Sequence, residues 1–147
     1  MVGVLLVSHG KMAEGMKDSI ELIMGEAESL DTASLVAGQD FEEFKKDVAS
    51  KIKQLDSGDG VLVYVDLYGA SPYNATMFSF QELKESGTDI RVLSGMNLPM
   101  IMEVLAMRSA MGLEELTQMG LNSGKDGIQE PVSDLLNGQN EDEDGDY

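Results

Sequence analysis

The chain has 147 residues, of which 42% are hydrophobic and 25% charged, a length and composition typical of one folded domain with its own core. Its 10 basic and 27 acidic residues give a formal charge of −17, which disfavours binding to nucleic acid or to an anionic membrane surface. Because the sequence contains no cysteine, disulfides, thiolate metal ligands and a thiol nucleophile are excluded.

No segment predicts membrane insertion or export. Apolar runs such as residues 2–7 are too short to cross a bilayer. The same run lacks the basic lead-in and the small-residue cleavage site of a signal peptide. We therefore expect a soluble, cytoplasmic protein that does not span a membrane.

The first half of the chain alternates short apolar runs with helical patterns. Val2–Val7 is continuously apolar, as in a strand that is covered on both faces, and Leu30–Val36 is a weaker strand candidate. Between them, Lys11–Met24 has apolar residues at helical spacing. Phe41–Leu55 has the clearest three-and-four repeat, and Asp40 precedes it as a helix cap.

The second half continues the alternation. Val61–Val65 is a second strongly apolar strand. Ser71 as cap and Pro72 as the first helical residue then predict a helix that runs to about Ser86. The remaining expected elements are a strand over Ile90–Leu93, a helix to about Met107, a helix over Leu113–Leu121 and a short strand over Ile128–Val132.

This order predicts an α/β fold with a parallel sheet and helices on both faces. We expect an open, mostly parallel four-stranded sheet in the order 2-1-3-4. The phosphotransfer-type domain discussed below would occupy residues 1–135. Residues 136–147 would form an acidic, flexible tail, since the last seven residues carry five acids.

Ligands of such sheets bind beyond the carboxyl ends of the strands, where the strand order reverses. The first strand leads into His9 and the third leads into Asp66. In the order 2-1-3-4 these two strands are neighbours, so the only histidine of the sequence would face an aspartate. Taken separately, His9 also fits a helix-capping residue, and Asp66 fits an ordinary turn residue.

A histidine and a carboxylate in this arrangement support phosphoryl transfer. Neutral imidazole is a good nucleophile near neutral pH, and a carboxylate on its other nitrogen fixes the tautomer and stabilises the charged ring. Backbone amides of Gly10, Lys11 and Met12, at a helix start, would hold the phosphoryl group. The Lys11 side chain would offset its charge, and Ser71 would add donors.

Other chemistries lack their sequence signals. Neither G-x-G-x-x-G after the first strand nor G-x-x-x-x-G-K-[ST] is present, so no nucleotide cofactor is indicated. One histidine without cysteine does not build a usual zinc site, and we expect neither a metal nor a cofactor. A small hydrolase that uses Ser71 or Ser8 stays open, although no G-x-S-x-G elbow occurs.

Three blocks of sequence resemble one protein family. They are Val4-Leu-Leu-Val-Ser-His-Gly10, Val63-Tyr-Val-Asp-Leu-Tyr-Gly-Ala-Ser-Pro-Tyr-Asn74 and Gly95-Met-Asn-Leu-Pro-Met100. In order and spacing they are similar to the mannose-family enzyme IIA domains of the bacterial phosphoenolpyruvate-dependent sugar phosphotransferase system, over about residues 1–130.

The resemblance implies a phosphohistidine relay, a phosphotransferase of sugar uptake. His9 would accept a phosphoryl group from the phosphocarrier protein HPr and pass it to an enzyme IIB partner, and Asp66 would hydrogen-bond the histidine. The resemblance also implies a homodimer that exchanges a short C-terminal strand, a role that Ile128–Val132 would take. Without a fused IIB domain in this sequence, we expect a stand-alone IIA protein.

Two other functions remain open within the same fold. One is the phosphotransferase subunit of a dihydroxyacetone kinase system, which also uses a histidine after its first strand. The other is a non-catalytic regulatory module. The block from Asp66 to Asn74 fits the sugar IIA family better, and the presence of both His9 and Asp66 argues against a module that has lost its activity.

Overall fold

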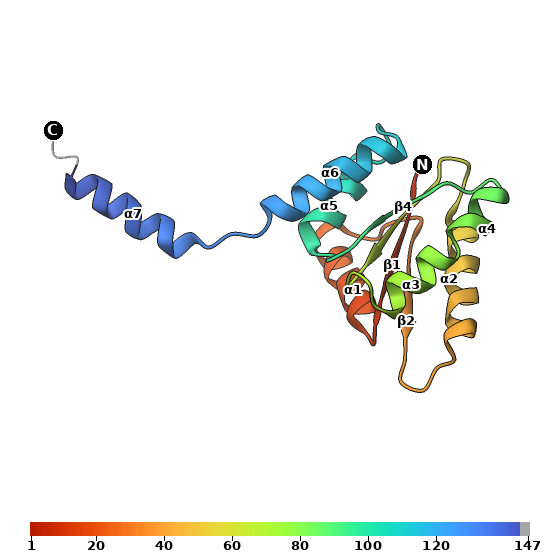
Figure 1. Ribbon diagram of the computed structural model, residues 1–147. Helices are drawn as coiled ribbons and strands as arrows, with labels where there is room; N and C mark the ends of the chain where they lie inside the picture. Colours follow the sequence, from red (N-terminus) through yellow and green to blue (C-terminus); the bar gives the residue numbers. More distant parts are fainter. Residues whose placement is uncertain (145–147) are drawn as a thin grey trace.

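The computed structural model describes residues 1–144, with side chains described to residue 138. Its centre is a parallel four-stranded sheet in the order β2-β1-β3-β4, which confirms the predicted fold (Figure 1). The strands are β1 (Gly3–His9), β2 (Leu30–Leu35), β3 (Val61–Val65) and β4 (Ile90–Leu93).

Helices cover both faces of the sheet. Helices α1 (Met12–Met24), α5 (Leu98–Met107) and α6 (Leu113–Asp126) share one apolar cluster with the sheet. On the opposite face lie α2 (Phe41–Leu55), α3 (Ser71–Phe78) and α4 (Phe80–Glu85), which share a second cluster. The sheet therefore separates two cores, as is expected for strands joined by helical crossovers.

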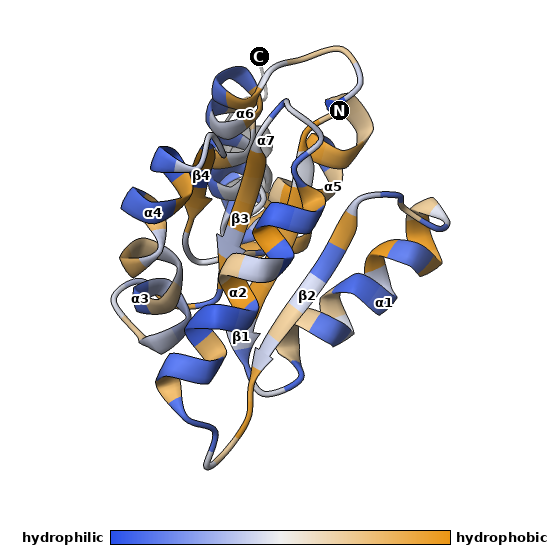
Figure 2. Ribbon diagram, turned by 90° about the vertical axis from the view of Figure 1, so that its right-hand side faces the viewer, coloured by the Kyte–Doolittle hydropathy of each residue, from blue (hydrophilic) through white to orange (hydrophobic). Residues whose placement is uncertain are grey.

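Strand β1 shows why its sequence has no polar alternation. Val4 and Leu6 point into the first cluster, whereas Leu5 and Val7 point into the second, because successive side chains leave a strand on opposite faces. Strand β3 is buried along its whole length. In Figure 2 the first part of β3 is coloured as hydrophobic, and the strand lies between helices that carry hydrophilic residues.

Two of the predicted helix starts have different outcomes. The Asp40 side chain accepts a hydrogen bond from the amide of Glu43 at 3.2 Å, which confirms the predicted cap of α2. The prediction for Ser71 was wrong, since this residue is the first in α3 and Ala70 occupies the cap position without a side-chain bond. Pro72 at the second helical position needs no amide partner.

The expected single helix from Ser71 to about Ser86 is two helices with a break at Ser79. The buried Ser79 hydroxyl donates a hydrogen bond to the carbonyl of Ala75 at 2.9 Å. Serine hydroxyls that bond back to the preceding turn bend helices. The break separates α3 from α4 and was not predicted from the hydrophobic pattern.

The C-terminal region differs most from the predictions. Helix α6 continues five residues beyond the expected Leu121. The strand predicted over Ile128–Val132 was wrong for the single chain, because no neighbouring strand pairs with this segment and Pro131 begins helix α7 (Pro131–Asp144). This helix lies apart from the sheet in Figure 1, and its Leu135 is 66% exposed. Residues 145–147 of the predicted tail lie outside the described residues.

Candidate functional site

The carboxyl ends of β1 and β3 bring together the two residues that the strand order predicted to meet. His9 is the last residue of β1, and Asp66 directly follows β3. The strands pair with Val7 opposite Val65, and the amide of Asp66 donates to the carbonyl of Val7 at 3.3 Å. The crossover that separates His9 from Asp66 in the sequence thus returns the chain to the same edge.

His9 and Asp66 are joined by two contacts. The His9 ring Nδ1 lies 2.7 Å from Asp66 Oδ2, and the His9 backbone amide donates to the same oxygen at 2.9 Å. The side chain of His9 is 49% exposed, whereas that of Asp66 is only 10% exposed. A buried carboxylate therefore holds a histidine ring that is open to solvent.

This geometry assigns the tautomer of His9. A nitrogen that faces a carboxylate oxygen at this distance carries the ring proton and donates it, which leaves the lone pair on Nε2. The other oxygen of Asp66, Oδ1, is buried and accepts no hydrogen bond within residues 1–138. Within the described residues, both hydrogen-bond partners of the Asp66 carboxylate are therefore atoms of His9.

The turn after β1 places the start of α1 beside this ring. Gly10 has a φ of +55°, a left-handed conformation that favours glycine, and its amide donates to the carbonyl of Leu35 at 2.8 Å. The predicted role of Gly10 as an amide donor to a phosphoryl group is therefore not supported. Lys11 is the cap residue of α1 and Met12 its first helical residue, and neither amide donates a hydrogen bond to another described residue.

Ser8, in β1 directly before His9, was considered from the sequence only as a hydrolase nucleophile. Its hydroxyl is fully buried and accepts a hydrogen bond from the amide of Ala13 at 2.8 Å. The sequence does contain a signal for a structural role of Ser8, because this single hydroxyl residue directly before His9 interrupts an otherwise apolar strand.

The predicted donor Ser71 directly follows the loop that carries Asp66. It is half-buried at the start of α3. Among the described residues, neither the Ser71 nor the Ser8 hydroxyl is hydrogen-bonded to His9. The hydrolase alternative therefore lacks the serine–histidine contact that would activate a nucleophile.

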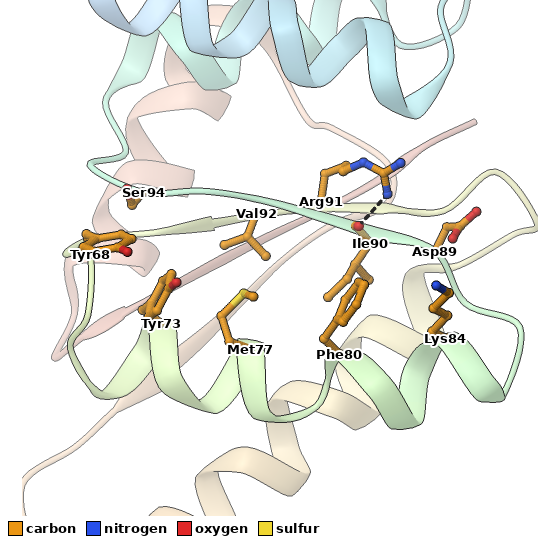
Figure 3. A pocket seen from close by; sticks show the side chains of 10 residues that line it. All are labelled: Tyr68, Tyr73, Met77, Phe80, Lys84, Asp89, Ile90, Arg91, Val92 and Ser94. Atoms are coloured by element: carbon orange, nitrogen blue, oxygen red, sulfur yellow. Dashed lines mark hydrogen bonds between the residues drawn. The ribbon is translucent and has the colours of Figure 1, made fainter.

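A groove lies next to this site, not in it. It has a volume of about 560 Å³ and runs along the outer edge of β4, between that strand and α3 and α4 (Figure 3). Tyr68 and Tyr73 close the end nearest the Asp66 loop, with ring centroids 4.8 Å apart. The neighbouring Tyr68 hydroxyl raises the pKa of Tyr73. The groove thus marks the open edge of the sheet.

Neither a membrane span nor a metal cluster is found in the part of the chain that the structure describes. No helix there combines the length and the apolar character that a bilayer crossing requires. No three histidine or acidic side chains of that part converge on a point where they could hold a metal ion.

A sequence model of the EIIA-man family, described as "PTS system fructose IIA component", matches residues 3–120. The chain is 27% identical over 129 residues to the PTS system mannose-specific EIIAB component of Escherichia coli K12, a match that covers 87% of this chain and 39% of that protein. It is also 28% identical over 116 residues to the PTS system fructose-specific EIIA component of Bacillus subtilis, covering 79% and 77%. The chain thus spans well under half of the first relative's length.

Solved structures are similar over most of the chain. The phosphotransferase system component EIIA from Streptococcus agalactiae superposes with a TM-score of 0.80 at 27% identity and covers 90% of this chain and 99% of its own. The mannose/sorbose-specific IIA subunit from Enterococcus faecalis has a TM-score of 0.76 at 26% identity, with coverages of 88% and 93%. Sequence and structure therefore indicate the same relatives.

Proposed function

This chain belongs to the EIIA-man family, the mannose-family IIA components of the sugar phosphotransferase system, and we propose that it is a phosphohistidine relay in which His9 carries the phosphoryl group. The family gives the chain a role in sugar phosphotransfer. Our proposal adds the residue, the donor and the acceptor: phospho-HPr would load His9, and an enzyme IIB partner would unload it.

The contact between His9 and Asp66 is the observation that carries this proposal. It directs the lone pair of a half-exposed ring outward, at Nε2, and supplies a buried negative charge behind the ring. A macromolecular donor can approach a ring that lies at the rim of the sheet. A nucleophile that must meet two different partner proteins in turn requires such an open position.

In the first transfer, the Nε2 lone pair of His9 attacks the phosphorus atom of the donor. A new N–P bond forms, the bond between phosphorus and the donor breaks, and the donor keeps that electron pair. The His9 ring then carries a positive charge, which the Asp66 carboxylate at Nδ1 stabilises. The second transfer reverses these roles, with the His9 ring as leaving group and the IIB partner as nucleophile.

The start of α1 would hold the transferred group. The amides of Lys11 and Met12 are among the donors that remain at this helix end, and the helix dipole favours negative charge there. The exposed Lys11 side chain would add a positive charge. Ser71, at the start of α3, would contribute a further donor from the neighbouring loop.

The proposal extends to assembly and to cellular location. We propose a cytoplasmic homodimer in which Pro131 and Val132 leave the start of α7 and Ile128–Val132 of one subunit pairs with the open edge of β4 in the other. Ile128 is 77% exposed in the single chain, in keeping with a residue that a partner covers. Sedimentation equilibrium of the full chain tests this, because a monomer at micromolar concentration would contradict it.

We propose a domain over residues 1–135 and an acidic, flexible tail over residues 136–147. The family match ends at residue 120, and helix α7 crosses the proposed boundary. Limited proteolysis should cut beyond the match and leave a resistant core, whereas first cuts inside residues 1–120 would contradict this division.

Intact-mass analysis after incubation with phosphoenolpyruvate, enzyme I and HPr tests the relay. We expect one phosphoryl group that is labile in acid and stable in alkali, and its absence in His9→Ala. Because the sequence has one histidine, the loss of such a group in His9→Ala assigns it to that residue. HPr that becomes phosphorylated in the same mixture shows that the donor proteins are active.

A wild-type chain that stays unmodified beside phosphorylated HPr would contradict the proposal that HPr is the donor. A His9→Ala variant that is still modified would contradict the proposal that His9 carries the phosphoryl group. In the first case, the regulatory module and the dihydroxyacetone kinase subunit become the readings to test next.

A further inference from the structure

Ser8 is a polar residue inside the apolar core of the sheet. It lies in β1 with 0% exposure, between Val7, which is also fully buried, and the half-exposed His9. A buried hydroxyl is costly unless it is hydrogen-bonded. This one accepts from the amide of Ala13 at 2.8 Å and lies 3.4 Å from the carbonyl of Gly10.

The bond to Ala13 replaces a missing helix cap. In most helices the cap residue itself accepts a hydrogen bond from the second or third helical amide. Lys11 occupies the cap position of α1 and makes no such bond, and Ala13 is the second helical residue. Ser8 supplies the acceptor from the preceding strand, so that strand and helix are tied directly across the turn that carries His9.

The hydrogen bond between Ser8 and Ala13 also determines which backbone amides of the turn are left without a hydrogen-bond acceptor. The Gly10 amide is bonded to Leu35, and the Ala13 amide is bonded to Ser8. The amides of Lys11 and Met12 lie between these two fixed points. Their direction relative to the His9 ring depends on both bonds, since the turn is anchored at each end.

We infer that Ser8 is a positioning residue: its hydroxyl holds the turn from His9 to Ala13 so that the amides of Lys11 and Met12 face a phosphoryl group on His9 Nε2. This inference rests on the proposed phosphorylation of His9. Ser8 does not touch the reacting atoms. It acts through the backbone of the helix start.

Removal of the hydroxyl in Ser8→Ala should leave the Ala13 amide buried without a partner and let the turn move. Displacements of about 1 Å near reacting groups can lower rates by about 100-fold. We expect His9 phosphorylation to slow by about tenfold or more and Ser8→Thr, which keeps the hydroxyl, to restore most of the rate. Ser79→Ala is the control, because Ser79 is also a buried serine whose hydroxyl is bonded to the backbone, at the break between α3 and α4.

The donor for this test should be phosphoramidate, a small reagent that needs no partner protein. Each full-length variant is first shown to be folded by circular dichroism and thermal unfolding. The rate of His9 phosphorylation is then followed by mass spectrometry, and the amide ¹H–¹⁵N shifts of Lys11 and Met12 are recorded before and after phosphorylation. In the wild type and Ser8→Thr these two amides should shift strongly, and in Ser8→Ala they should not.

A Ser8→Ala variant with the wild-type rate and the wild-type amide shifts would overturn the inference. So would an equal loss of rate in Ser79→Ala, because that result would mean a general loss of stability. Failure of the proposed relay can be distinguished from failure of this inference. If the wild type accepts nothing from phospho-HPr, but the wild type and Ser8→Ala still differ with phosphoramidate, the proposed donor is overturned and the role of Ser8 is supported.

Discussion

One carboxylate oxygen of Asp66, Oδ2, contacts both the backbone amide and the ring Nδ1 of His9, at 2.9 and 2.7 Å. The first contact fixes the end of β1 relative to β3, and the second fixes the ring. Asp66 therefore sets the position of the histidine at two points, and in the proposed relay its charge would stabilise the phosphorylated ring.

Asp66→Ala should slow phosphoryl uptake by His9 roughly 10- to 100-fold, since a hydrogen bond to a charged group is worth about 1.5–3 kcal/mol and each 1.36 kcal/mol is tenfold. The initial rate of phosphorylation by phospho-HPr, followed by mass spectrometry, measures this loss. Asp31→Ala is the control, because that carboxylate bonds only the adjacent amide of Thr32. Uptake at the wild-type rate in Asp66→Ala would show that the orientation argument is wrong.

The Asp56 carboxylate predicts a pH-dependent stability. Partial burial raises its pKa, but hydrogen bonds from the amides of Gly58 and Gly60, at 2.9 and 3.1 Å, contribute to a net lowering. A lowered pKa in the folded state means that the stabilisation is present above the unfolded-state pKa and is lost as pH falls through the folded-state pKa.

Asp56→Ala should accordingly lower the free energy of unfolding by about 1–2 kcal/mol at pH 7, and the difference from wild type should shrink as the carboxylate is protonated below pH about 4. Urea unfolding at a series of pH values measures both. The exposed Asp18 offers a matched control, since Asp18→Ala should show no such trend. A deficit that grows toward acid pH would reverse the sign and refute the assignment.

Two glycine positions should respond oppositely to alanine. A Cβ on Gly3 would lie 2.7 Å from the carbonyl oxygen of Leu55 and 2.9 Å from its Cβ, so Gly3→Ala should destabilise the fold by about 1–3 kcal/mol. A Cβ on Gly15, within α1, meets nothing within 4 Å. Gly15→Ala should therefore stabilise by about 0.5–1 kcal/mol, and urea unfolding of both variants checks the opposite signs.

The two central strands, β1 and β3, could be predicted from the sequence because they are buried on both faces. Val61–Val65 has no competing helical pattern, and its boundaries agree with the structure. The approach of His9 to Asp66 followed from the strand order together with the rule that sites lie where that order reverses. These are consequences of topology and do not require side-chain detail.

The missed features depend on single hydrogen bonds that a hydrophobic pattern does not report. Ser79 breaks a helix by bonding to Ala75, and Ser8 replaces a cap by bonding to Ala13. The used amide of Gly10 is a similar case, because its acceptor, Leu35, belongs to a neighbouring strand. The segment Ile128–Val132 differs in kind, since a strand requires a partner strand that a single chain does not supply.

The wide sequence separation of His9 and Asp66 also has a consequence during synthesis. The two residues are 57 positions apart, and ribosomes add about 5–20 residues per second. The histidine is therefore made roughly 3–11 s before the aspartate that orients it. Until β3 docks beside β1, a nascent or truncated chain carries an imidazole that Asp66 does not orient, so the phosphoryl transfer that we propose would require the completed sheet.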